Sequence, residues 1–300
     1  IDQFSFLNVF KYLTVRTGLS VMTSLIVVFI VGAPLIKIFS EKMITGPIRR
    51  DGPIDHIVKK SGTPTMGGVI IIIGIISSTF LWADLTNIYV WTLIFISLSL
   101  GGLGLLDDIL KIKLNNSSGL KSRYKFLGQL IIGAIALLIL IKFSNHEFLF
   151  NLYFPFFKNL ILQMGIFFIP FALFVIIGAS NAVNLTDGLD GLASGLLAIC
   201  FTVFAAIAYI SGRVDFSNYL NILYLPGAGE LAIFSSAMAG ACIGYLWYNS
   251  HPAEVFMGDT GSLSAGAALG TLAVLLKKEL LLFIIGGVFV WEACTVIIQI

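Results

Sequence analysis

Residues 88–108 read IYVWTLIFISLSLGGLGLLDD, an apolar run that ends in two adjacent aspartates. Residues 88–106 carry no charged side chain, and about 20 apolar residues are enough for a helix to cross a bilayer. The run therefore predicts a membrane span. Because ionisable side chains are costly at membrane depth, Asp107 and Asp108 at its end indicate a functional site.

The composition of the whole chain is typical of a membrane protein. Of its 300 residues, 58% are hydrophobic and only 11% are charged, whereas soluble domains carry about 25% charged residues. The net charge of +2 offers no large basic surface. The composition thus excludes a soluble enzyme, a disordered chain and a nucleic-acid-binding protein. Cys200, Cys242 and Cys294 all lie in apolar runs, so they predict neither a disulfide framework nor a zinc site.

Outward from residue 88, the apolar runs predict an all-α polytopic membrane protein with nine spans in one domain, residues 1–300. Glycines four residues apart, at Gly191/Gly195 and Gly240/Gly244, indicate close helix packing in lipid. The predicted spans are 18–38, 66–83, 88–106, 126–143, 160–180, 188–210, 231–248, 260–276 and 279–300.

The distribution of lysine and arginine predicts the orientation. The loops after spans 1, 3, 5 and 7 hold ten of these residues, against seven in the opposite set, which includes the N-terminus. Since cytoplasmic loops are rich in Lys and Arg, loops 39–65 and 107–125 are predicted to be cytoplasmic and the N-terminus to lie outside. Residues 1–20 show no small-residue cleavage site, which argues against a signal peptide.

Polar residues concentrate on the predicted cytoplasmic face. Charged groups are seldom placed at span ends in such numbers without a role, so this face is predicted to carry the functional site. The aspartates there are Asp107, Asp108, Asp187, Asp190 and Asp259, and their polar neighbours are Lys60, Lys111, Lys125, Asn181, Asn184, Asn249 and His251.

Residues 181–193, NAVNLTDGLDGLA, give the strongest signal. Asn181, Asn184, Asp187 and Asp190 recur every three residues, which predicts one helical face. Oxygen ligands of this kind suit Mg²⁺ held together with water and substrate phosphates, and no nearby His or Cys favours zinc. A helix cap between two spans explains one Asn and one Asp, but not four groups in register.

The other polar groups also allow plainer interpretations. Lys111 stands four residues after Asp107 and could form an ordinary helix ion pair. Asp259 precedes small and hydroxyl residues suited to an anion, yet it could equally cap span 8. His251 is more often a hydrogen-bonded loop residue than an acid–base group. Together, carboxylates for a divalent cation and lysines on the same face predict phosphoryl transfer beside the membrane.

Several sequence motifs follow one another along the chain in this order: GPIRRDGP at 46–53, HIVKKSGTPTMGG at 56–68, Asp107-Asp108, residues 181–193 and NSHPAEVFMGDTG at 249–261. From about residue 40 to its C-terminus, the chain resembles the bacterial phospho-N-acetylmuramoyl-pentapeptide transferases. This family belongs to the polyprenyl-phosphate N-acetylhexosamine-1-phosphate transferases. Ile109 stands where the family commonly has an aromatic residue, a tolerable departure.

The resemblance implies a ten-helix enzyme of the bacterial cytoplasmic (inner) membrane, with its active site facing the cytoplasm and a homodimer as the family expectation. It implies Mg²⁺-dependent transfer of phospho-MurNAc-pentapeptide from UDP-MurNAc-pentapeptide to undecaprenyl phosphate. The products are lipid I and UMP, in the first membrane step of peptidoglycan synthesis. The family's histidine-rich loop and last helix would follow Ile300, so the chain is expected to be truncated.

The same resemblance assigns roles to individual residues. It implies a metal site at Asp259, with Asp187 beside it. Implied catalytic residues are Asp107, Asp108, Asp187, Asp190 and Lys111, and implied substrate-binding residues are Lys60, Thr65, Lys125, Asn181, Asn184, Asn249, His251 and Phe256.

Three alternatives stay open at this point. Direct attack by the acceptor phosphate is favoured, with Asp107 positioning or deprotonating it, but a covalent phosphate on Asp107 or Asp108 is the rival. A related enzyme could move a simple N-acetylhexosamine phosphate instead. A cation-coupled transporter would also hold Asp and Asn in a bundle, although its charges should lie near the bilayer midplane.

Overall fold

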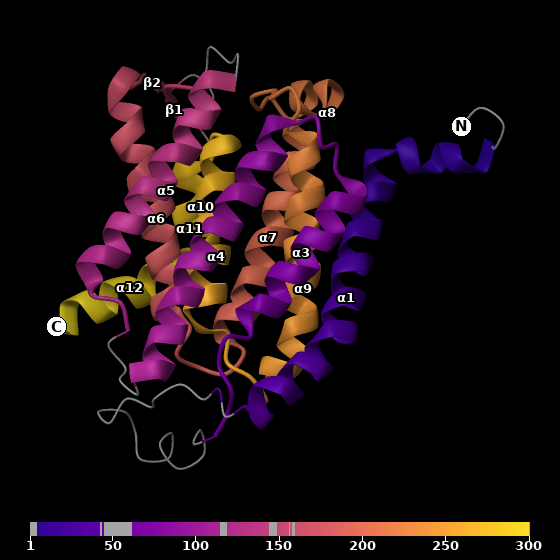
Figure 1. Cartoon of the computed structure of the whole chain (residues 1–300). Helices are drawn as coiled ribbons and strands as arrows, with labels where there is room; N and C mark the ends of the chain where they lie inside the picture. The colour runs from indigo at the N-terminus through magenta and orange to yellow at the C-terminus, as the bar shows by residue number, and fades with distance from the viewer. Residues whose placement is uncertain are drawn as a thin grey trace.

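The computed structural model of the chain describes residues 5–42, 44, 62–114, 119–143, 149–155, 157 and 160–299. Its long helices run between the two ends of a bundle, and η1 extends sideways from it (Figure 1). We name the end with the turns before α7 and α10 the acid end, and the end with β1, β2 and α8 the hairpin end. The elements are η1 (Ser5–Lys11), α1 (Leu13–Glu41), α3 (Gly68–Trp82), α4 (Ile88–Leu114), α5 (Ser122–Phe143), β1 (Asn151–Tyr153), β2 (Ile161–Gln163), η2 (Gly165–Phe167), α6 (Phe168–Thr186), α7 (Leu192–Ser211), α8 (Val214–Tyr219), α9 (Gly229–Asn249), α10 (Gly258–Leu275), α11 (Glu279–Ile285) and α12 (Gly287–Gln299).

The structure is that of a mostly helical, multi-pass membrane protein. Each of the nine predicted spans overlaps one of the helices. Within the described residues, six helical segments are long and apolar enough to cross a membrane, or seven if α11 and α12 form one bent span. Helix α3 is apolar but shorter, so the count of nine spans stays a prediction.

The prediction of a purely helical chain is wrong at one place. Residues 161–163, predicted to begin a span, form β2 and pair antiparallel with β1, with Leu152 opposite Leu162. Helix α6 begins only at Phe168, after Gly165 adopts a φ of +54°. The two strands lie at the hairpin end (Figure 1), at the edge of the apolar helices, where open strand edges can reach water.

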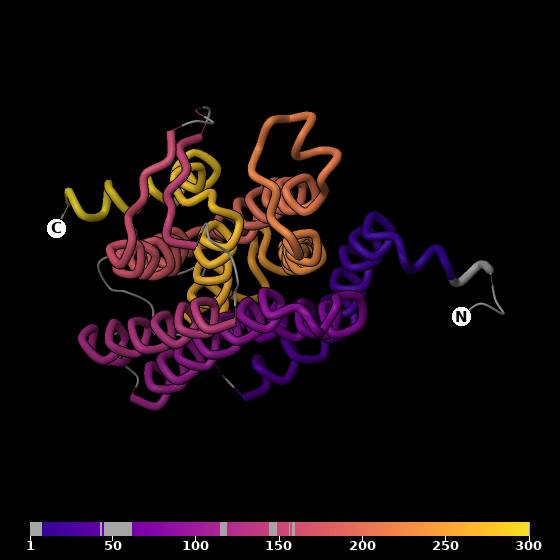
Figure 2. Tube along the Cα trace, turned by 90° about the horizontal axis from the view of Figure 1, so that it is seen from above, coloured from indigo at the N-terminus to yellow at the C-terminus, as the bar shows by residue number. Residues whose placement is uncertain are grey.

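The last predicted span, 279–300, is not one straight helix. Helices α11 and α12 meet at an angle of 82°. The break falls at Gly286 and Gly287, and adjacent small residues are a common cause of sharp helix kinks. Seen along the bundle, α12 projects away from the other helices (Figure 2).

Helices α9 and α10 form the centre of the bundle, and both are buried along most of their length. Glycines let their neighbours approach closely, as predicted for Gly240 and Gly244. A Cβ on Gly240 would lie 2.4 Å from Val21 O in α1, and one on Gly244 3.0 Å from Val28. The same prediction is wrong for Gly195, whose added Cβ would meet nothing within 4 Å. Gly191 does approach a neighbouring helix, since its added Cβ would lie 3.1 Å from Leu246 of α9, but it does so from the turn before α7.

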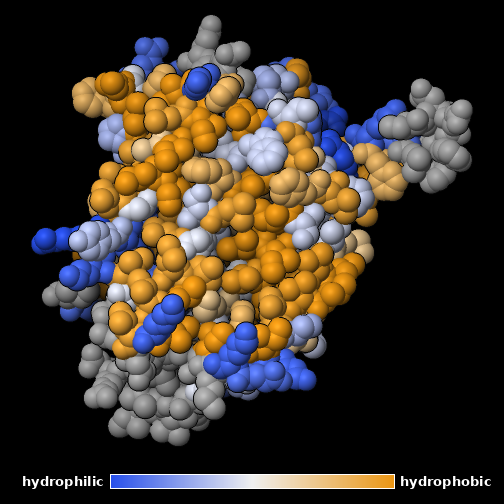
Figure 3. Space-filling view, in the orientation of Figure 1, coloured by the Kyte–Doolittle hydropathy of each residue, from blue (hydrophilic) through white to orange (hydrophobic). Residues whose placement is uncertain are grey.

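Apolar side chains cover the middle of the visible face, with polar ones nearer the two ends (Figure 3). Met22, Ile30 and Leu138 are 60%, 66% and 63% exposed. An exposed apolar band of this extent marks a surface for lipid.

A buried ion pair fixes the hairpin end beneath β1. Lys277 adopts a φ of +55° after α10, a position where glycine is preferred. Its Nζ lies 3.2 Å from Glu279 Oε1 and donates a hydrogen bond to Leu149 O. Burial lowers the pKa of the Lys277 ammonium, and Glu279 opposes this effect. The side chain thus links the end of α10, the start of α11 and the segment before β1.

Candidate active site

Three buried carboxylates meet at the acid end, where α4 passes the first turn of α10. Asp107, Asp108 and Asp259 each offer one carboxylate oxygen, and these oxygens lie within 4.8 Å of one another. The sequence analysis had placed the two adjacent aspartates at the end of a span, but α4 continues to Leu114, so they lie inside a helix. The three residues are 1%, 3% and 8% exposed.

Two lysines complete a compact charged cluster. Lys111 Nζ lies 2.7 Å from Asp107 Oδ2 and 2.9 Å from Asp259 Oδ2. Lys125 Nζ, from α5, lies 2.5 Å from Asp259 Oδ2 and 3.6 Å from Asp107 Oδ2. The lysine side chains remain 24% and 18% exposed, so the cluster can be reached by a polar substrate. We name Asp107, Asp108, Lys111, Lys125 and Asp259 the acid–lysine cluster.

Asp108 caps the start of α10 from a neighbouring helix. Its Oδ1 accepts a hydrogen bond from the backbone N–H of Asp259 at 3.1 Å. Its Oδ2 accepts from the backbone N–H and the hydroxyl of Thr260 at 3.0 and 2.7 Å. A carboxylate at a helix N-terminus satisfies free N–H groups and the helix dipole. Both oxygens of Asp108 are therefore used to place Asp259.

Asp107 points to the lysines instead. Its Oδ1 accepts a hydrogen bond from the backbone N–H of Leu120 at 2.6 Å. Its Oδ2 is buried, and within the described part of the chain it meets the ammonium groups of Lys111 and Lys125. The two neighbouring aspartates thus have different surroundings, because adjacent helical side chains point about 100° apart.

Helix α6 supplies an amide to the cluster. The Asn184 side-chain N–H₂ donates to Asp259 Oδ1 at 2.7 Å and to Ser262 Oγ at 2.8 Å. The predicted helical face of four polar residues is wrong, however, because α6 ends at Thr186. Asp187 is the residue that follows the helix, and Asp190 lies in a turn that ends at Gly191, whose φ is +74°. Left-handed glycine ends the regular register.

Asp190, Asn249 and His251 join the two turns at the acid end. Asp190 Oδ2 accepts from the Ala253 backbone N–H at 3.3 Å and lies 3.1 Å from Nδ1 of the exposed His251. Asn249 Oδ1 accepts from the Gly191 backbone N–H at 3.1 Å. These contacts hold the turn before α7 against the turn before α10.

The segment before α3 forms a further wall beside the cluster. The Phe256 backbone N–H donates to Pro64 O at 2.9 Å, and the Gly67 N–H donates to Phe256 O at 2.8 Å. A Cβ on Gly258 would lie 3.0 Å from Thr65 Oγ1 and 2.7 Å from Asp108 Oδ2. Thr65 and Phe256 therefore lie near the acid–lysine cluster, while Lys60 lies outside the described residues.

The donor atoms of the cluster fit a hard divalent cation. Within the part of the chain that the structure describes, Asp107, Asp108 and Asp259 form the group of acidic side chains that could hold a metal ion, and Asp187 does not belong to it. Carboxylate oxygens are the ligands that Mg²⁺ prefers. Asp108 faces the α10 backbone, whereas Asp259 Oδ2 and Asp107 Oδ2 face the two lysines, so a cation bound to these two oxygens would share them with Lys111 and Lys125.

Gln129 is a residue that the sequence reasoning missed. It lies in α5, is 1% exposed and pairs with the amide of Asn181. A signal was available: Gln129 follows Lys125 by four residues, one helical turn, at the start of an apolar run. A buried amide in such a run requires a partner.

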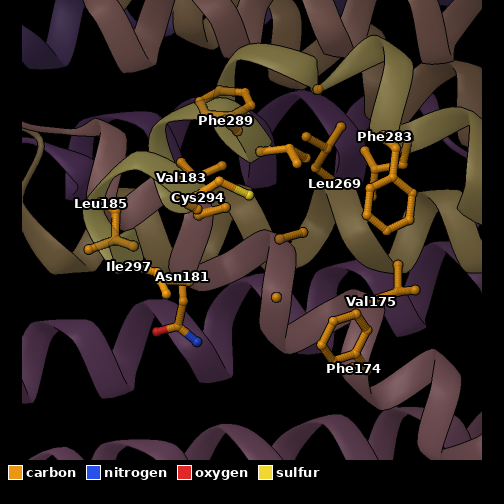
Figure 4. Close-up of a pocket in the computed structure, with 17 residues that line it drawn as sticks. Phe174, Val175, Asn181, Val183, Leu185, Leu269, Phe283, Phe289, Cys294 and Ile297 are labelled. Carbon is orange, nitrogen blue, oxygen red and sulfur yellow. The ribbon is translucent and has the colours of Figure 1, made fainter. Parts of the chain in front are cut away.

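An apolar cavity of about 350 Å³ opens along α6, α10, α11 and α12. Figure 4 shows Phe174, Phe283 and Phe289 around it, with the Asn181 amide among the apolar side chains. Among the described residues that line the cavity, Asn181 and Cys294 are the members with a polar atom in the side chain. Since α6 runs towards the acid end, Asn181 lies nearer the acid–lysine cluster than Phe174 does.

The chain is similar to known transferases over its whole length. Residues 90–277 match the family model glycosyl transferase family 4, and residues 60–72 match signature 1 of phospho-N-acetylmuramoyl-pentapeptide-transferase. The phospho-N-acetylmuramoyl-pentapeptide-transferase of Pelagibacter ubique is 54% identical over 300 residues, which cover 100% of this chain and 83% of the relative. The enzyme of the same name from Thermodesulfovibrio yellowstonii is 50% identical over 299 residues, 100% of this chain and 82% of the relative.

Proposed function

Because the chain belongs to the phospho-N-acetylmuramoyl-pentapeptide-transferase family, we propose that it moves phospho-MurNAc-pentapeptide from UDP-MurNAc-pentapeptide to undecaprenyl phosphate. The products are lipid I and UMP, and the reaction takes place at the cytoplasmic side of a bacterial inner membrane. The observation that carries the proposal is the acid–lysine cluster, which unites carboxylates from α4 and α10 with lysines from α4 and α5.

The proposed reaction is a direct phosphoryl transfer. An oxygen of the acceptor phosphate forms a bond to the sugar-linked phosphorus, and the bond from that phosphorus to the bridging oxygen breaks, so that UMP leaves. Lys111 and Lys125 hold phosphate oxygens as point charges, and Asp107 positions the acceptor or takes its proton. Such reactions depend mainly on positioning and charge neutralisation.

Mg²⁺ is proposed as the cofactor, held by Asp259 and Asp107. When bound, it would neutralise the diphosphate and improve the nucleotide leaving group. Asn184 keeps Asp259 oriented through its hydrogen bond to Oδ1. Asp187, the other predicted ligand, lies after α6 and outside this group of carboxylates.

The surroundings of Asp108 argue against the covalent route at that residue. Both of its oxygens accept hydrogen bonds from α10, and attack on phosphorus would break these bonds. Asp107 remains as a possible nucleophile in the rival mechanism. Recovery of a phosphorylated protein after incubation with donor alone would overturn the direct route.

The apolar cavity is proposed to hold part of the acceptor's hydrocarbon chain. Its lining fits a polyprenyl chain, and Asn181 lies on the side towards the acid–lysine cluster. A lipid entering here would bring its phosphate towards Lys125 without taking the chain through water. Such an entry would account for building a reaction with a water-soluble nucleotide donor into a membrane bundle.

UMP release should depend on the muramoyl donor. With undecaprenyl phosphate and Mg²⁺, the detergent-solubilised protein is expected to release UMP from UDP-MurNAc-pentapeptide but not from UDP-GlcNAc. Release from UDP-GlcNAc alone would keep the phosphoryl transfer and replace the donor class. Uptake of a cation into vesicles without UMP release would favour the transporter instead.

Cys294 offers a direct probe of the acceptor cavity. It is exposed and lines the cavity, whereas Cys200 and Cys242 are buried. Undecaprenyl phosphate is expected to slow the reaction of Cys294 with a maleimide, because the lipid would cover the thiol. UDP-MurNAc-pentapeptide alone should leave the rate unchanged. Equal labelling rates with and without the lipid would exclude this cavity as the acceptor site.

A further inference from the structure

Two buried amides face each other between α5 and α6. Asn181 Nδ2 donates to Gln129 Oε1 at 2.9 Å, and Gln129 Nε2 donates to Asn181 Oδ1 at 3.3 Å. Asn181 Nδ2 also donates to Ile177 O in its own helix. Each side-chain amide thus uses both its oxygen and its nitrogen inside the protein.

The amide pair lies on the same sides of α5 and α6 as two residues that contact Asp259. Gln129 lies one helical turn after Lys125, and Asn181 lies three residues before Asn184. Residues at these spacings share one side of a helix. Lys125 and Asn184 contact the two different oxygens of Asp259, Oδ2 and Oδ1. The distance between α5 and α6 at the amide pair therefore sets how both residues meet Asp259.

The pair also lies where the apolar cavity approaches the acid–lysine cluster. Asn181 lines the cavity, and Gln129 lies behind it on the next helix. A hydrophobic pair at this position could join the helices equally well, since apolar packing is the usual contact in such bundles. Two amides are instead matched in length and direction, which fixes one register between α5 and α6.

We propose that Gln129 is a positioning residue: its amide pair with Asn181 holds Lys125 and Asn184 in place on Asp259, and thereby serves the acceptor phosphate. The proposal rests on the proposed function, because it assigns the acceptor side of that reaction. Among the residues that the structure describes, Gln129 bonds to Asn181 and not to the carboxylates of the cluster, so it acts through Lys125.

The test exchanges the two amides. Gln129→Asn shortens one side of the pair by a methylene, and Asn181→Gln lengthens the other by the same amount. Each single variant is expected to raise the KM for undecaprenyl phosphate about tenfold or more, the effect of one lost buried hydrogen bond. The KM for UDP-MurNAc-pentapeptide should change much less. The double variant restores the total length, so its acceptor KM should return to within about threefold of the starting protein.

The outcomes separate this proposal from simpler explanations. Leu138→Ala, on the lipid-exposed side of α5, is the matched control and should leave both KM values unchanged. Equal rises in both KM values, or a double variant as poor as the worse single one, would overturn the positioning role. Size-exclusion profiles identify variants that fail to fold. If one of the single variants fails to fold, the acceptor KM of the double variant still decides the question. A starting protein that releases no UMP from any donor would instead contradict the proposed function.

Discussion

Asp259→Asn is expected to lower UMP release by on the order of 10³-fold, the scale seen when a key electrostatic group is removed from an active site. The substitution keeps the size of the side chain and the backbone N–H that Asp108 accepts. It removes the negative charge that lies between Lys111 and Lys125. The measurement is kcat with saturating donor, acceptor and Mg²⁺.

The physical reason is that the Asp259 carboxylate joins side chains from three helices, α4, α5 and α6. Lys111 and Lys125 contact its Oδ2, and Asn184 donates to its Oδ1. An amide at this position would turn an N–H₂ group towards an ammonium group or another amide. The proposed Mg²⁺ would also lose a charged ligand, so excess Mg²⁺ should not restore the rate.

Asp215→Asn is the control for this variant. Asp215 lies at the hairpin end, its side chain is 61% exposed, and it pairs with Arg213. Because exposed ion pairs contribute little, its loss should leave UMP release unchanged. Activity of Asp259→Asn above a tenth of that control would contradict the assignment of Asp259.

The sequence predicted where the helices lie better than how they end. Spans of apolar residues are set by local composition, and each predicted span overlaps a helix. The strand at 161–163 and the break at Gly286 were missed, because a window of apolar residues reads alike in a strand, a straight helix and a kinked one. Their shape depends on neighbours that the window does not contain.

For the site, too, the residue types were predictable from the sequence, whereas their geometry was not. The residue types predicted Asp107, Asp108 and Asp259, and the structure brings their carboxylates within 4.8 Å of one another. The resemblance implied that both aspartates are catalytic and favoured Asp107 as the group that meets the acceptor; in the structure Asp108 caps α10 and Asp107 faces the lysines. Which backbone a carboxylate meets depends on how α4 crosses α10, and no spacing in the chain reports that crossing.

Gly104→Ala is expected to lower UMP release by about 10²-fold, because it would force these two helices apart. A Cβ on Gly104 would lie 2.2 Å from Asp259 O and 2.7 Å from the Thr260 N atom. Both are backbone atoms at the first turn of α10, so no side chain can turn away to make room. A displacement of about 1 Å in an active site can cost a factor of this size.

The loss should reach the site through Asp108. Gly104 lies one turn before it on α4, and the hydrogen bonds from Asp259 N and Thr260 N to Asp108 are 3.1 and 3.0 Å long. Separating the helices would stretch these bonds beyond useful length and move Asp259 away from Lys111. The measurement is again kcat, with folding followed by size exclusion and thermal unfolding.

Gly102→Ala gives the matched control on the same helix. Its added Cβ would meet nothing within 4 Å, and alanine favours a helix over glycine by up to about 1 kcal/mol. The two variants therefore differ in the contact with α10 and not in backbone propensity. Gly102→Ala should keep full activity, and equal activity in both variants would show that the approach of α4 to α10 does not position the carboxylates. A loss confined to Gly104→Ala would place the requirement at the contact with the first turn of α10, because that contact is what distinguishes the two positions.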